Sequence, residues 1–185
     1  MTISDLRYVF FFLLISTLIL SCSKPGDDPT VKLFKQVTPE ISGIDFSNDL
    51  VENDSLNYLA YAYIYMGGGV SAGDINNDGL VDIFFTGNQV SDKLYLNKGD
   101  LQFEDITSSA IGMTSSEGWH TGVSMVDVNQ DGWLDIYVCR AYFDNPIDRT
   151  NLLFINNQDG TFSERAQEFG VDDINYSIGA SFFDY

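Results

Sequence analysis

Two short acidic segments hold the residues of this chain that are best suited to bind a metal ion. Their sequences are D-I-N-N-D-G-L-V-D at residues 74–82 and D-V-N-Q-D-G-W-L-D at residues 127–135. Both follow the pattern D-x-N-x-D-G-x-x-D, and they start 53 residues apart. Side-chain oxygens at alternate positions, with a glycine that permits a tight turn, are the arrangement that binds a hard cation such as Ca²⁺. The two segments therefore predict two calcium loops.

The spacing also predicts the ligands of each ion. In the first loop they are the side chains of Asp74, Asn76, Asp78 and Asp82 and the carbonyl of Leu80. In the second loop they are the side chains of Asp127, Asn129, Asp131 and Asp135 and the carbonyl of Trp133. Three carboxylates in each set suit a divalent cation, with water completing the shell. One copy alone would be explained equally well as an ordinary Asx-turn, and the second copy favours metal binding.

An EF-hand is the nearest alternative to these loops. Its loop ends in a bidentate glutamate at the twelfth position, which Phe85 and Val138 occupy here. The residues after each loop, I-F-F-T at 83–86 and I-Y-V-C at 136–139, are of the types enriched in strands. We therefore expect the loops to connect strands rather than helices, which also argues against a dockerin-like pair of calcium loops.

The sequence similarity extends beyond the loops. G-V-S-A-G-D at 69–74 and G-V-S-M-V-D at 122–127 lead into them, and a third copy, G-A-S-F-F-D, stands at 179–184. Residues 94–103 also align with residues 153–162, each as a strand, a polar turn and a returning strand. A partial copy runs from residue 34 to residue 43.

One full unit therefore holds about four short strands. In the first unit we expect them near residues 69–73, 83–86, 94–97 and 102–106. Four antiparallel strands that recur every 50 to 60 residues are typical of a β-propeller blade. The fold class predicted is all-β, with about two full blades and partial ones over residues 31–185.

These residues resemble the FG-GAP/VCBS repeat family, whose calcium-loop blades occur in integrin α-chain propellers and in bacterial lipoproteins similar to cartilage acidic protein. The resemblance extends roughly from residue 33 to residue 185. It implies calcium sites that tie down the loop between the first two strands of a blade, a role in binding or adhesion, and no shared enzymatic activity. The Phe-Gly and Gly-Ala-Pro ends that name the family are replaced by T-G-N at 86–88 and R-A-Y at 140–142, which weakens the analogy with integrin ligand binding.

Residues 1–22 predict a lipoprotein signal peptide. Arg7 precedes an apolar run at 8–20, which is too short to span a bilayer as a helix but suits a signal peptide. The run ends in I-L-S-C, which resembles a lipobox and predicts lipidation of Cys22; an ordinary signal peptide with an incidental cysteine is the alternative. Residues 23–30 have the composition of a flexible tether. We expect an outer-membrane or cell-surface position, with the membrane reached through the N-terminal lipid.

Composition argues against several other functions. The formal net charge of −18 disfavours nucleic acid and anionic lipid as partners. Cys139 would be the only other cysteine, so no internal disulfide is expected, and its β-run predicts that it is buried. A Ser-His-Asp site would have to use His120, the only histidine, for which a positional role at the entry of a blade is the preferred interpretation.

Aromatic residues gather at 58–65. Tyr61, Tyr63 and Tyr65 would share one face of a strand, and we expect them to pack between blades. A stacking platform for sugar rings or for a partner protein is the alternative. Trp119 and Trp133 are expected to pack between blades or against loops.

The sequence as a whole predicts a calcium-binding propeller module that binds a protein or a glycan and is not an enzyme. Two blades do not close a ring, since propellers have four to eight, so we expect an N-terminal fragment of a longer protein. One alternative is the targeting module of a larger secreted carbohydrate-active enzyme whose catalytic domain is missing here. Another is an accessory lipoprotein for nutrient uptake.

Overall fold

A computed structural model of the chain describes residues 34–112, 118–142 and 149–183. The chain forms two units, Met1–Gln36 and Val37–Tyr185, and only residues 34–36 of the first unit are described. The predicted signal peptide, Cys22 and the tether therefore lie outside the described residues. None of the helices in the described ranges is long and apolar enough to cross a membrane.

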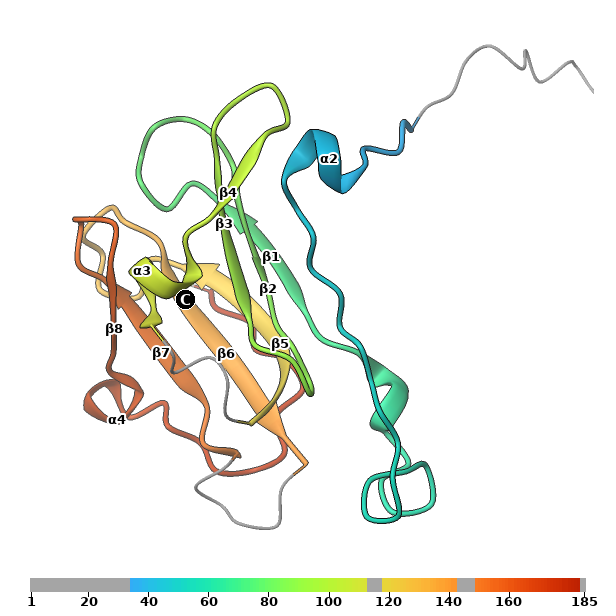
Figure 1. Ribbon diagram of the computed structural model, residues 1–185. Coiled ribbons are helices and arrows are strands. Elements are labelled where there is room, and N and C mark those ends of the chain that lie inside the picture. The colour runs from blue at the N-terminus through green and yellow to red at the C-terminus, as the bar shows by residue number, and fades with distance from the viewer. Residues whose placement is uncertain (1–33, 113–117, 143–148, 184–185) are drawn as a thin grey trace, which may run out of the picture. The chain divides into compact units, whose positions relative to one another are not determined.

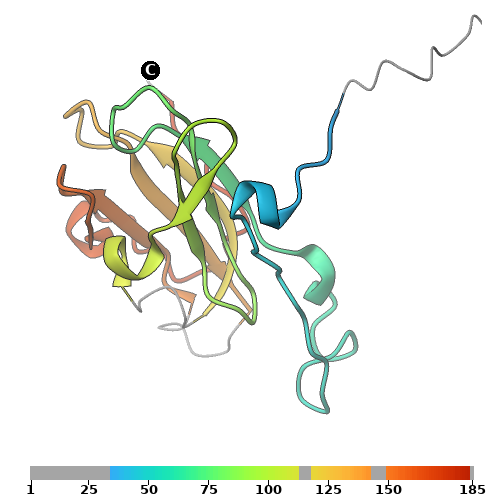
Figure 2. The ribbon, with the colours of Figure 1, turned by 45° about the horizontal axis from the view of Figure 1, so that its top comes forward.

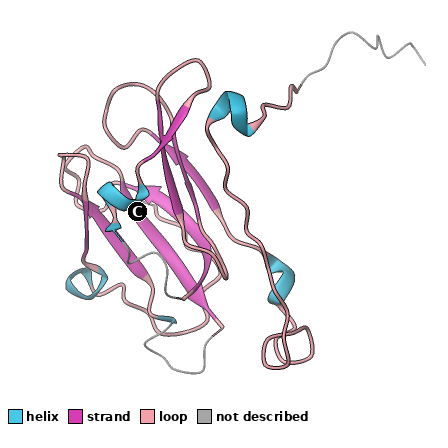
Figure 3. Ribbon diagram, viewed as in Figure 1, coloured by secondary structure: helices cyan, strands magenta, loops and turns pink. Residues whose placement is uncertain are grey.

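Two four-stranded antiparallel sheets make up the larger unit (Figures 1 and 3). The first, which we call blade 1, consists of β1 (Val70–Gly73), β2 (Asp82–Phe85), β3 (Lys93–Asn97) and β4 (Phe103–Asp105). The second, blade 2, consists of β5 (Trp119–Val126), β6 (Asp135–Ala141), β7 (Leu152–Asn156) and β8 (Phe162–Glu164). In both sheets the strands lie side by side in chain order, as in propeller blades. The predicted fold class is confirmed, and the described residues form no closed propeller.

The sequence repeat is also a repeat of strand register. Ser71 lies opposite Phe84 in blade 1, and Ser124 lies opposite Tyr137 at the equivalent place in blade 2. The second strand of each blade is central and therefore needs apolar residues on both faces. Every residue of β6 is buried, and the strand carries the β-branched and aromatic side chains of Ile136, Tyr137 and Val138 in succession.

A one-turn helix follows the last strand of each blade: α3 (Thr107–Ala110) in blade 1 and α4 (Ala166–Phe169) in blade 2. The partial copy near the start ends in a third such helix, α2 (Pro39–Ser42). Gly43 and Gly170 end α2 and α4 in the left-handed conformation, with φ of 75° and 68°, which glycine adopts without a steric penalty. Residues 34–38, where a repeat would have its fourth strand, form no strand.

The main apolar core lies between the two sheets, which face each other in Figure 2. Blade 1 contributes Phe84 and Leu94, and blade 2 contributes Ile136, Val138 and Phe154. Each of these side chains is at most 1% exposed. Burying one such side chain stabilises the fold by about 1.5–3 kcal/mol, so the contact between blades is a large part of the stability of this unit.

Glycines let the first strands of successive repeats approach closely. A Cβ on Gly69 would lie 2.6 Å from the carbonyl oxygen of Thr121, next to Gly122. A Cβ on Gly122 would in turn lie 2.6 Å from the carbonyl oxygen of Ile178, next to Gly179. Residues 178–180 therefore lie beside β5 in space in the same way as β5 lies beside the start of blade 1. Residues 179–183 of the third sequence copy therefore take the place of the first strand of a further repeat, although they do not form a strand.

The predicted strand at residues 58–65 is wrong. This stretch forms turns and the 3₁₀ helix η1 (Ile64–Met66). The Oδ1 atom of Asn57 accepts hydrogen bonds from the backbone N–H groups of Leu59 and Ala60, at 2.9 and 3.1 Å. Such local side-chain bonds satisfy backbone groups that a strand would pair with a neighbour. The tyrosines consequently do not share one face.

Candidate metal centre

Side chains of the first acidic loop hold its backbone in a turn by accepting hydrogen bonds from backbone N–H groups of the same loop. Asp74 accepts hydrogen bonds from the backbone N–H groups of Asp78 and Gly79, at 3.2 and 2.8 Å. Asp78 accepts one from the N–H of Leu80 at 2.8 Å. Asn76 accepts from Asp78 N–H at 3.1 Å, and its amide donates to the Asp78 carboxylate at 2.9 Å. Four of the predicted ligand residues therefore already lie in one tight turn.

The second loop repeats this pattern residue for residue. Asp127 accepts from the N–H groups of Asp131 and Gly132, at 3.1 and 2.8 Å. Asp131 accepts from Trp133 N–H at 2.9 Å. Asn129 accepts from Asp131 N–H at 3.0 Å and donates to its carboxylate at 2.9 Å. Two loops of different sequence thus share one fold, set by the positions of their Asp, Asn and Gly residues.

Both loops need left-handed backbone at two positions. In the first loop φ is 58° at Asn77 and 85° at Gly79, and in the second it is 60° at Gln130 and 87° at Gly132. Asparagine tolerates this region better than most residues and glycine adopts it freely. The glycine of the motif is therefore required by the turn itself, whether or not an ion is bound, while the other left-handed position is the variable residue between the motif's Asn and Asp.

The last aspartate of each loop is fully buried at the start of the second strand. Asp82 is 0% exposed and accepts hydrogen bonds from the N–H groups of Ile75, at 2.9 Å, and Asn97, at 2.8 Å. Asp135 is also 0% exposed and has the equivalent donors. These are the N–H groups of Val128, at 3.0 Å, and Asn156, at 2.9 Å. Each aspartate therefore ties the first residues of its loop to the third strand of its blade.

Burial raises the pKa of Asp82 and of Asp135 above the ordinary aspartate value. The hydrogen bonds from backbone N–H groups oppose this shift, and the carboxylates earlier in each loop add to it. Neither aspartate has an ion-pair partner within the described ranges. Because a buried carboxylate without a cation is costly, both positions have the electrostatics of a site that would gain from a bound cation.

The predicted ligands fit a hard cation in chemistry, but they are not assembled around one centre. All are oxygen donors, and a carboxylate oxygen that accepts one hydrogen bond keeps a further lone pair. In the part of the chain that the structure describes, no group of three or more His, Cys, Asp or Glu side chains is placed to hold a metal ion. Asp78 and Asp131 are exposed and point their oxygens at loop amides instead.

Two asparagines support the loops and were not predicted from the sequence. Asn97 donates its side-chain amide to the carbonyl of Val81 at 2.8 Å. Asn156 donates to the carbonyl of Leu134 at 3.2 Å and also reaches the carbonyl of Ile75, in the other blade, at 2.8 Å. Both asparagines stand at the same place in the aligned segments 94–103 and 153–162, which was the available signal.

The two loops also touch each other. The side-chain amide of Asn77 donates to the carbonyl of Gly132 at 3.1 Å. The amide of Gln158, in the turn after β7, donates to the Asp131 carboxylate at 3.1 Å. The loops are therefore adjacent at one end of the two blades, and a change in one reaches the other through a direct hydrogen bond.

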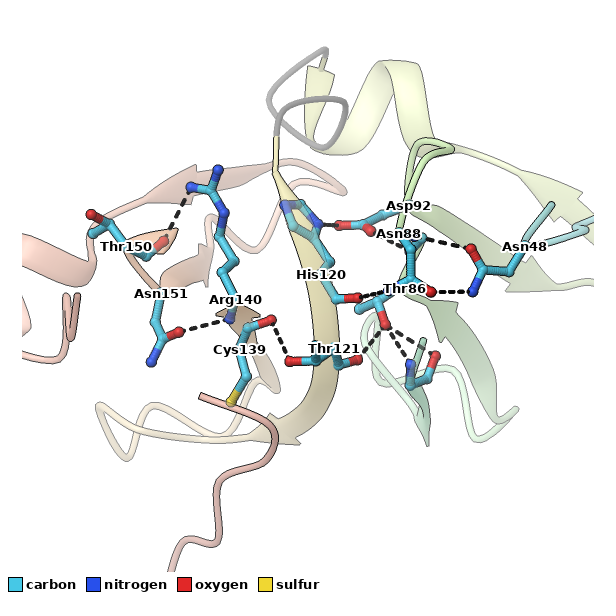
Figure 4. A network of polar contacts seen from close by, with 12 residues as sticks. Asn48, Thr86, Asn88, Asp92, His120, Thr121, Cys139, Arg140, Thr150 and Asn151 are labelled. Carbon is cyan, nitrogen blue, oxygen red and sulfur yellow. Dashed lines mark hydrogen bonds and ion pairs between the residues drawn. The ribbon is translucent and has the colours of Figure 1, made fainter. Parts of the chain in front are cut away.

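The single histidine belongs to a buried polar network between the blades (Figure 4). Its Nδ1 lies 2.7 Å from Oδ2 of Asp92. Its backbone N–H donates to Gly87 at 3.1 Å, and its carbonyl accepts from the amide of Asn88 at 2.8 Å. His120 is 1% exposed and Asp92 is 0% exposed. These contacts agree with the positional role that the sequence favours.

The remaining predicted features are found as follows. Cys139 is buried, as predicted, with 1% of its surface exposed. Trp119 is 1% exposed and packs against Tyr61 and Tyr142. Trp133 is half-buried in the second loop.

Comparison with known proteins identifies the repeat. The family model of the FG-GAP-like repeat matches residues 61–138. The match runs from the tyrosine-rich segment through all of blade 1 and into β6, and it includes both acidic loops. No curated protein matches the chain.

Proposed function

We propose, on the premise that residues 61–138 form an FG-GAP-like repeat, that the two acidic loops bind Ca²⁺ and make the unit a calcium-stabilised binding module. The module binds a protein or glycan partner and catalyses no reaction. It belongs to an exported protein that is anchored by a lipid on Cys22 at the outer membrane or cell surface.

The burial of Asp82 and Asp135 is the observation that supports calcium binding most strongly. Both carboxylates are 0% exposed, both have raised pKa values because of that burial, and both end a loop that holds two further aspartates. A plain Asx-turn needs no buried carboxylate at this position. The repetition in two blades shows that the arrangement is not an accident of one loop.

A bound Ca²⁺ would supply the positive charge that these positions lack. The side chains of Asp74, Asn76, Asp78 and Asp82 with the carbonyl of Leu80 would hold one ion. Their counterparts in the second loop would hold the other. Asp82 and Asp135 are already fixed by two amides each, so the exposed Asp78 and Asp131 would make the larger movement on binding. Extracellular calcium modules are weak, with Kd values on the order of 10⁻⁴–10⁻³ M.

Thermal unfolding in calcium and in chelator tests this proposal. In about 10 mM Ca²⁺ each site of that affinity would add roughly 1.4–2.7 kcal/mol of stability, so the melting temperature of the wild type should rise above its value in EGTA. Asp78→Ala and Asp131→Ala should each lose part of that rise. Equal melting temperatures of the wild type in calcium and EGTA would contradict the proposal.

Asp159→Ala is the matched control. Asp159 stands in a turn with the same backbone, φ being 65° at Gln158 and 86° at Gly160, and it accepts Thr161 N–H at 3.0 Å as Asp78 accepts Leu80 N–H. That turn lacks the first and last aspartates of the motif. The variant should therefore lose turn stability equally in calcium and in EGTA and keep the full calcium-dependent rise.

The surface location rests on the signal peptide and lipobox pattern, and it has its own test. Expression of the full chain in a Gram-negative host, followed by fractionation and mass measurement of the N-terminal peptide, should find diacylglycerol on Cys22 in the membrane fraction. Cys22→Ser should move the protein to the soluble exported fraction. An unmodified, cytoplasmic wild-type chain would refute the lipoprotein assignment while leaving calcium binding untouched.

A further inference from the structure

A cavity of about 520 Å³ lies at the end of blade 2 that is remote from the acidic loops. Ala141, the last residue of β6, lines it, whereas the first residue of β6 is Asp135 of the second loop. The other main lining residues come from two segments distant in sequence. They are Tyr61, Tyr63, Met66, Tyr176 and Ile178. The volume lies in the range of ligand pockets for small molecules.

Packed aromatic rings hold one wall of this cavity in place. The ring of Tyr61 lies 5.6 Å from that of Trp119, edge-on, and 4.3 Å from that of Tyr142. Trp119 is 1% exposed, so Tyr61 packs on a buried side chain. Tyr63 contacts Tyr61 edge-on at 6.0 Å and is 63% exposed. The cavity thus presents one fixed aromatic ring and one accessible ring from the same segment.

Tyr176 contributes a further aromatic ring to the lining. Its ring is 59% exposed, and the guanidinium carbon of Arg149 lies 4.6 Å from its centroid. This cation–π contact restrains the ring and places a positive charge beside the cavity. The net charge of −18 over the chain disfavours an anionic ligand.

The lining of the cavity includes three tyrosines, each of which carries a hydroxyl. The hydroxyls of Tyr61, Tyr63 and Tyr176 make no hydrogen bond to any part of the chain that the structure describes. Burial first, and then the neighbouring tyrosines, raise the pKa of Tyr61, so its hydroxyl stays protonated and can both donate and accept. Aromatic faces edged with free hydroxyls suit a ligand that has apolar C–H faces and hydroxyls around its rim.

We infer that this cavity binds a neutral hexopyranose unit of a glycan, stacked on the rings of Tyr63 and Tyr176. The inference names the ligand class of the binding function proposed above and rests on that function. The sugar ring is uncharged, its C–H faces match the two accessible rings, and its hydroxyls match those of the three tyrosines. The calcium loops at the other end of the blades would not touch it.

Calorimetric titration of the full chain in about 10 mM Ca²⁺ tests the inference, with maltose, cellobiose and N,N′-diacetylchitobiose as probes. At least one of these disaccharides should bind saturably in the millimolar range. Tyr63→Ala and Tyr176→Ala should each weaken that binding about tenfold, since each removes one stacking face. Both side chains are largely exposed, so the variants should keep the melting temperature of the wild type.

Tyr65→Ala is the matched control. Tyr65 lies in the same segment and is also 63% exposed, but it stacks on Tyr58 at 6.4 Å and does not line the cavity. Its variant should bind sugar like the wild type. Failure of all three disaccharides to bind at about 20 mM, equal binding by all variants, or saturable binding of tetramethylammonium in place of sugar would each overturn the inference.

The outcome for the cavity can be separated from the outcome for the loops. Sugar binding that fails while the melting temperature still rises with calcium would refute the glycan site alone. Sugar binding that depends on Tyr63 and Tyr176 while calcium has no effect on melting would refute the calcium loops alone.

Discussion

Asp92 and His120 join blade 1 to blade 2 through one buried contact, with His120 Nδ1 2.7 Å from Asp92 Oδ2. The equivalent position in the next repeat has the same geometry with neutral partners: the amide of Asn151 donates to the Ser177 hydroxyl at 2.9 Å. The Oδ1 atom of Asp92 and that of Asn151 also have the same task. Asp92 accepts Gly87 N–H and Asn151 accepts Arg140 N–H. Successive repeats are therefore joined by equivalent hydrogen-bond arrangements that use different residues.

Replacing Asp92 by alanine should destabilise the protein strongly. The change removes the carboxylate that contacts the buried His120 imidazole and leaves the Gly87 N–H without its acceptor. Leaving a buried hydrogen-bonding group without its partner costs about 1–3 kcal/mol for each group. Urea unfolding followed by circular dichroism measures the loss. A cost below about 1 kcal/mol would show that the contact contributes little to joining the blades.

Asp92→Asn is the informative control for that experiment, because asparagine keeps an oxygen for Gly87 N–H, as Asn151 does for Arg140. It should cost clearly less than Asp92→Ala. The double variant Asp92→Asn/His120→Ser copies the residues of the next repeat and should recover part of the loss that each single change causes. Strict additivity of the two changes would argue against a coupled pair.

The first strands of successive repeats lie close together, and this predicts that alanine will destabilise the protein at one glycine but not at another. Gly122→Ala would place a methyl group 2.6 Å from the carbonyl oxygen of Ile178, and such overpacking costs about 1–3 kcal/mol. Gly179→Ala should be tolerated, since a Cβ there meets no atom within 4 Å. Chemical denaturation of both variants checks this. Equal destabilisation would mean that residues 178–180 do not lie along β5.

The sequence predicted those features that depend on residues close together in the chain. The loop turns follow from Asp, Asn and Gly at fixed spacing, and Asp82 and Asp135 were identified because the motif places them four residues after the central aspartates. The four strands of blade 1 were predicted within one or two residues because the two repeats share one pattern. The calcium ligands themselves stay a prediction, since the oxygens are not gathered around a centre.

Contacts between residues far apart in the chain could not be predicted from the sequence. Asp92 and His120 are 28 positions apart and carry no shared motif, and their pairing depends on how two sheets pack. The tyrosine segment was predicted as a strand because alternate tyrosines suit one, but Asn57 caps a local turn instead. That turn brings Tyr61 onto Trp119, and the resulting cavity could be seen only in three dimensions.

The Cys139 thiol should be inert in the folded protein. It is 1% exposed, and burial raises its pKa to about 11, so almost no thiolate forms at pH 8. Iodoacetamide at pH 8 should leave the peptide that contains Cys139 unmodified in the native protein and modify it fully in denaturant, as read by mass spectrometry. Rapid alkylation of the native protein would contradict the burial of this β6 residue.

Asp105 should contribute to the loss of stability in acid. Burial raises its pKa, but the Lys93 ammonium and the hydrogen bonds from Thr107 outweigh this effect and lower the pKa below the ordinary value of 3.8. A lowered pKa in the folded state stabilises the protein above the unfolded value, and this stability is lost as the pH falls through the folded value. Since both side chains are about one-third exposed, the contribution is below about 1 kcal/mol.

Asp105→Asn should therefore flatten the fall in stability between about pH 5 and pH 2 and lower stability slightly at pH 7. Denaturant midpoints measured across this range check the sign. A fall in stability toward acid that is identical in the variant and the wild type would show that Lys93 and Thr107 do not hold the carboxylate.

The hydrogen bond from Asn77 to Gly132 should couple the two acidic loops in the binding of the proposed calcium ions. It connects the turn of the first loop to the backbone beside Asp131, and a single hydrogen bond of this kind contributes about 0.5–1.5 kcal/mol. Asn77→Gly removes the side-chain amide yet keeps a residue that accepts the φ of 58°. Calcium binding to the second loop should weaken by about two- to tenfold. Isothermal titration measures this in the Asp78→Ala background, where only the second loop is complete.

Gln130→Gly, at the equivalent left-handed position of the second loop, controls for added backbone freedom. If the two glycine variants weaken binding equally, chain flexibility explains the loss and the contact between loops carries no coupling.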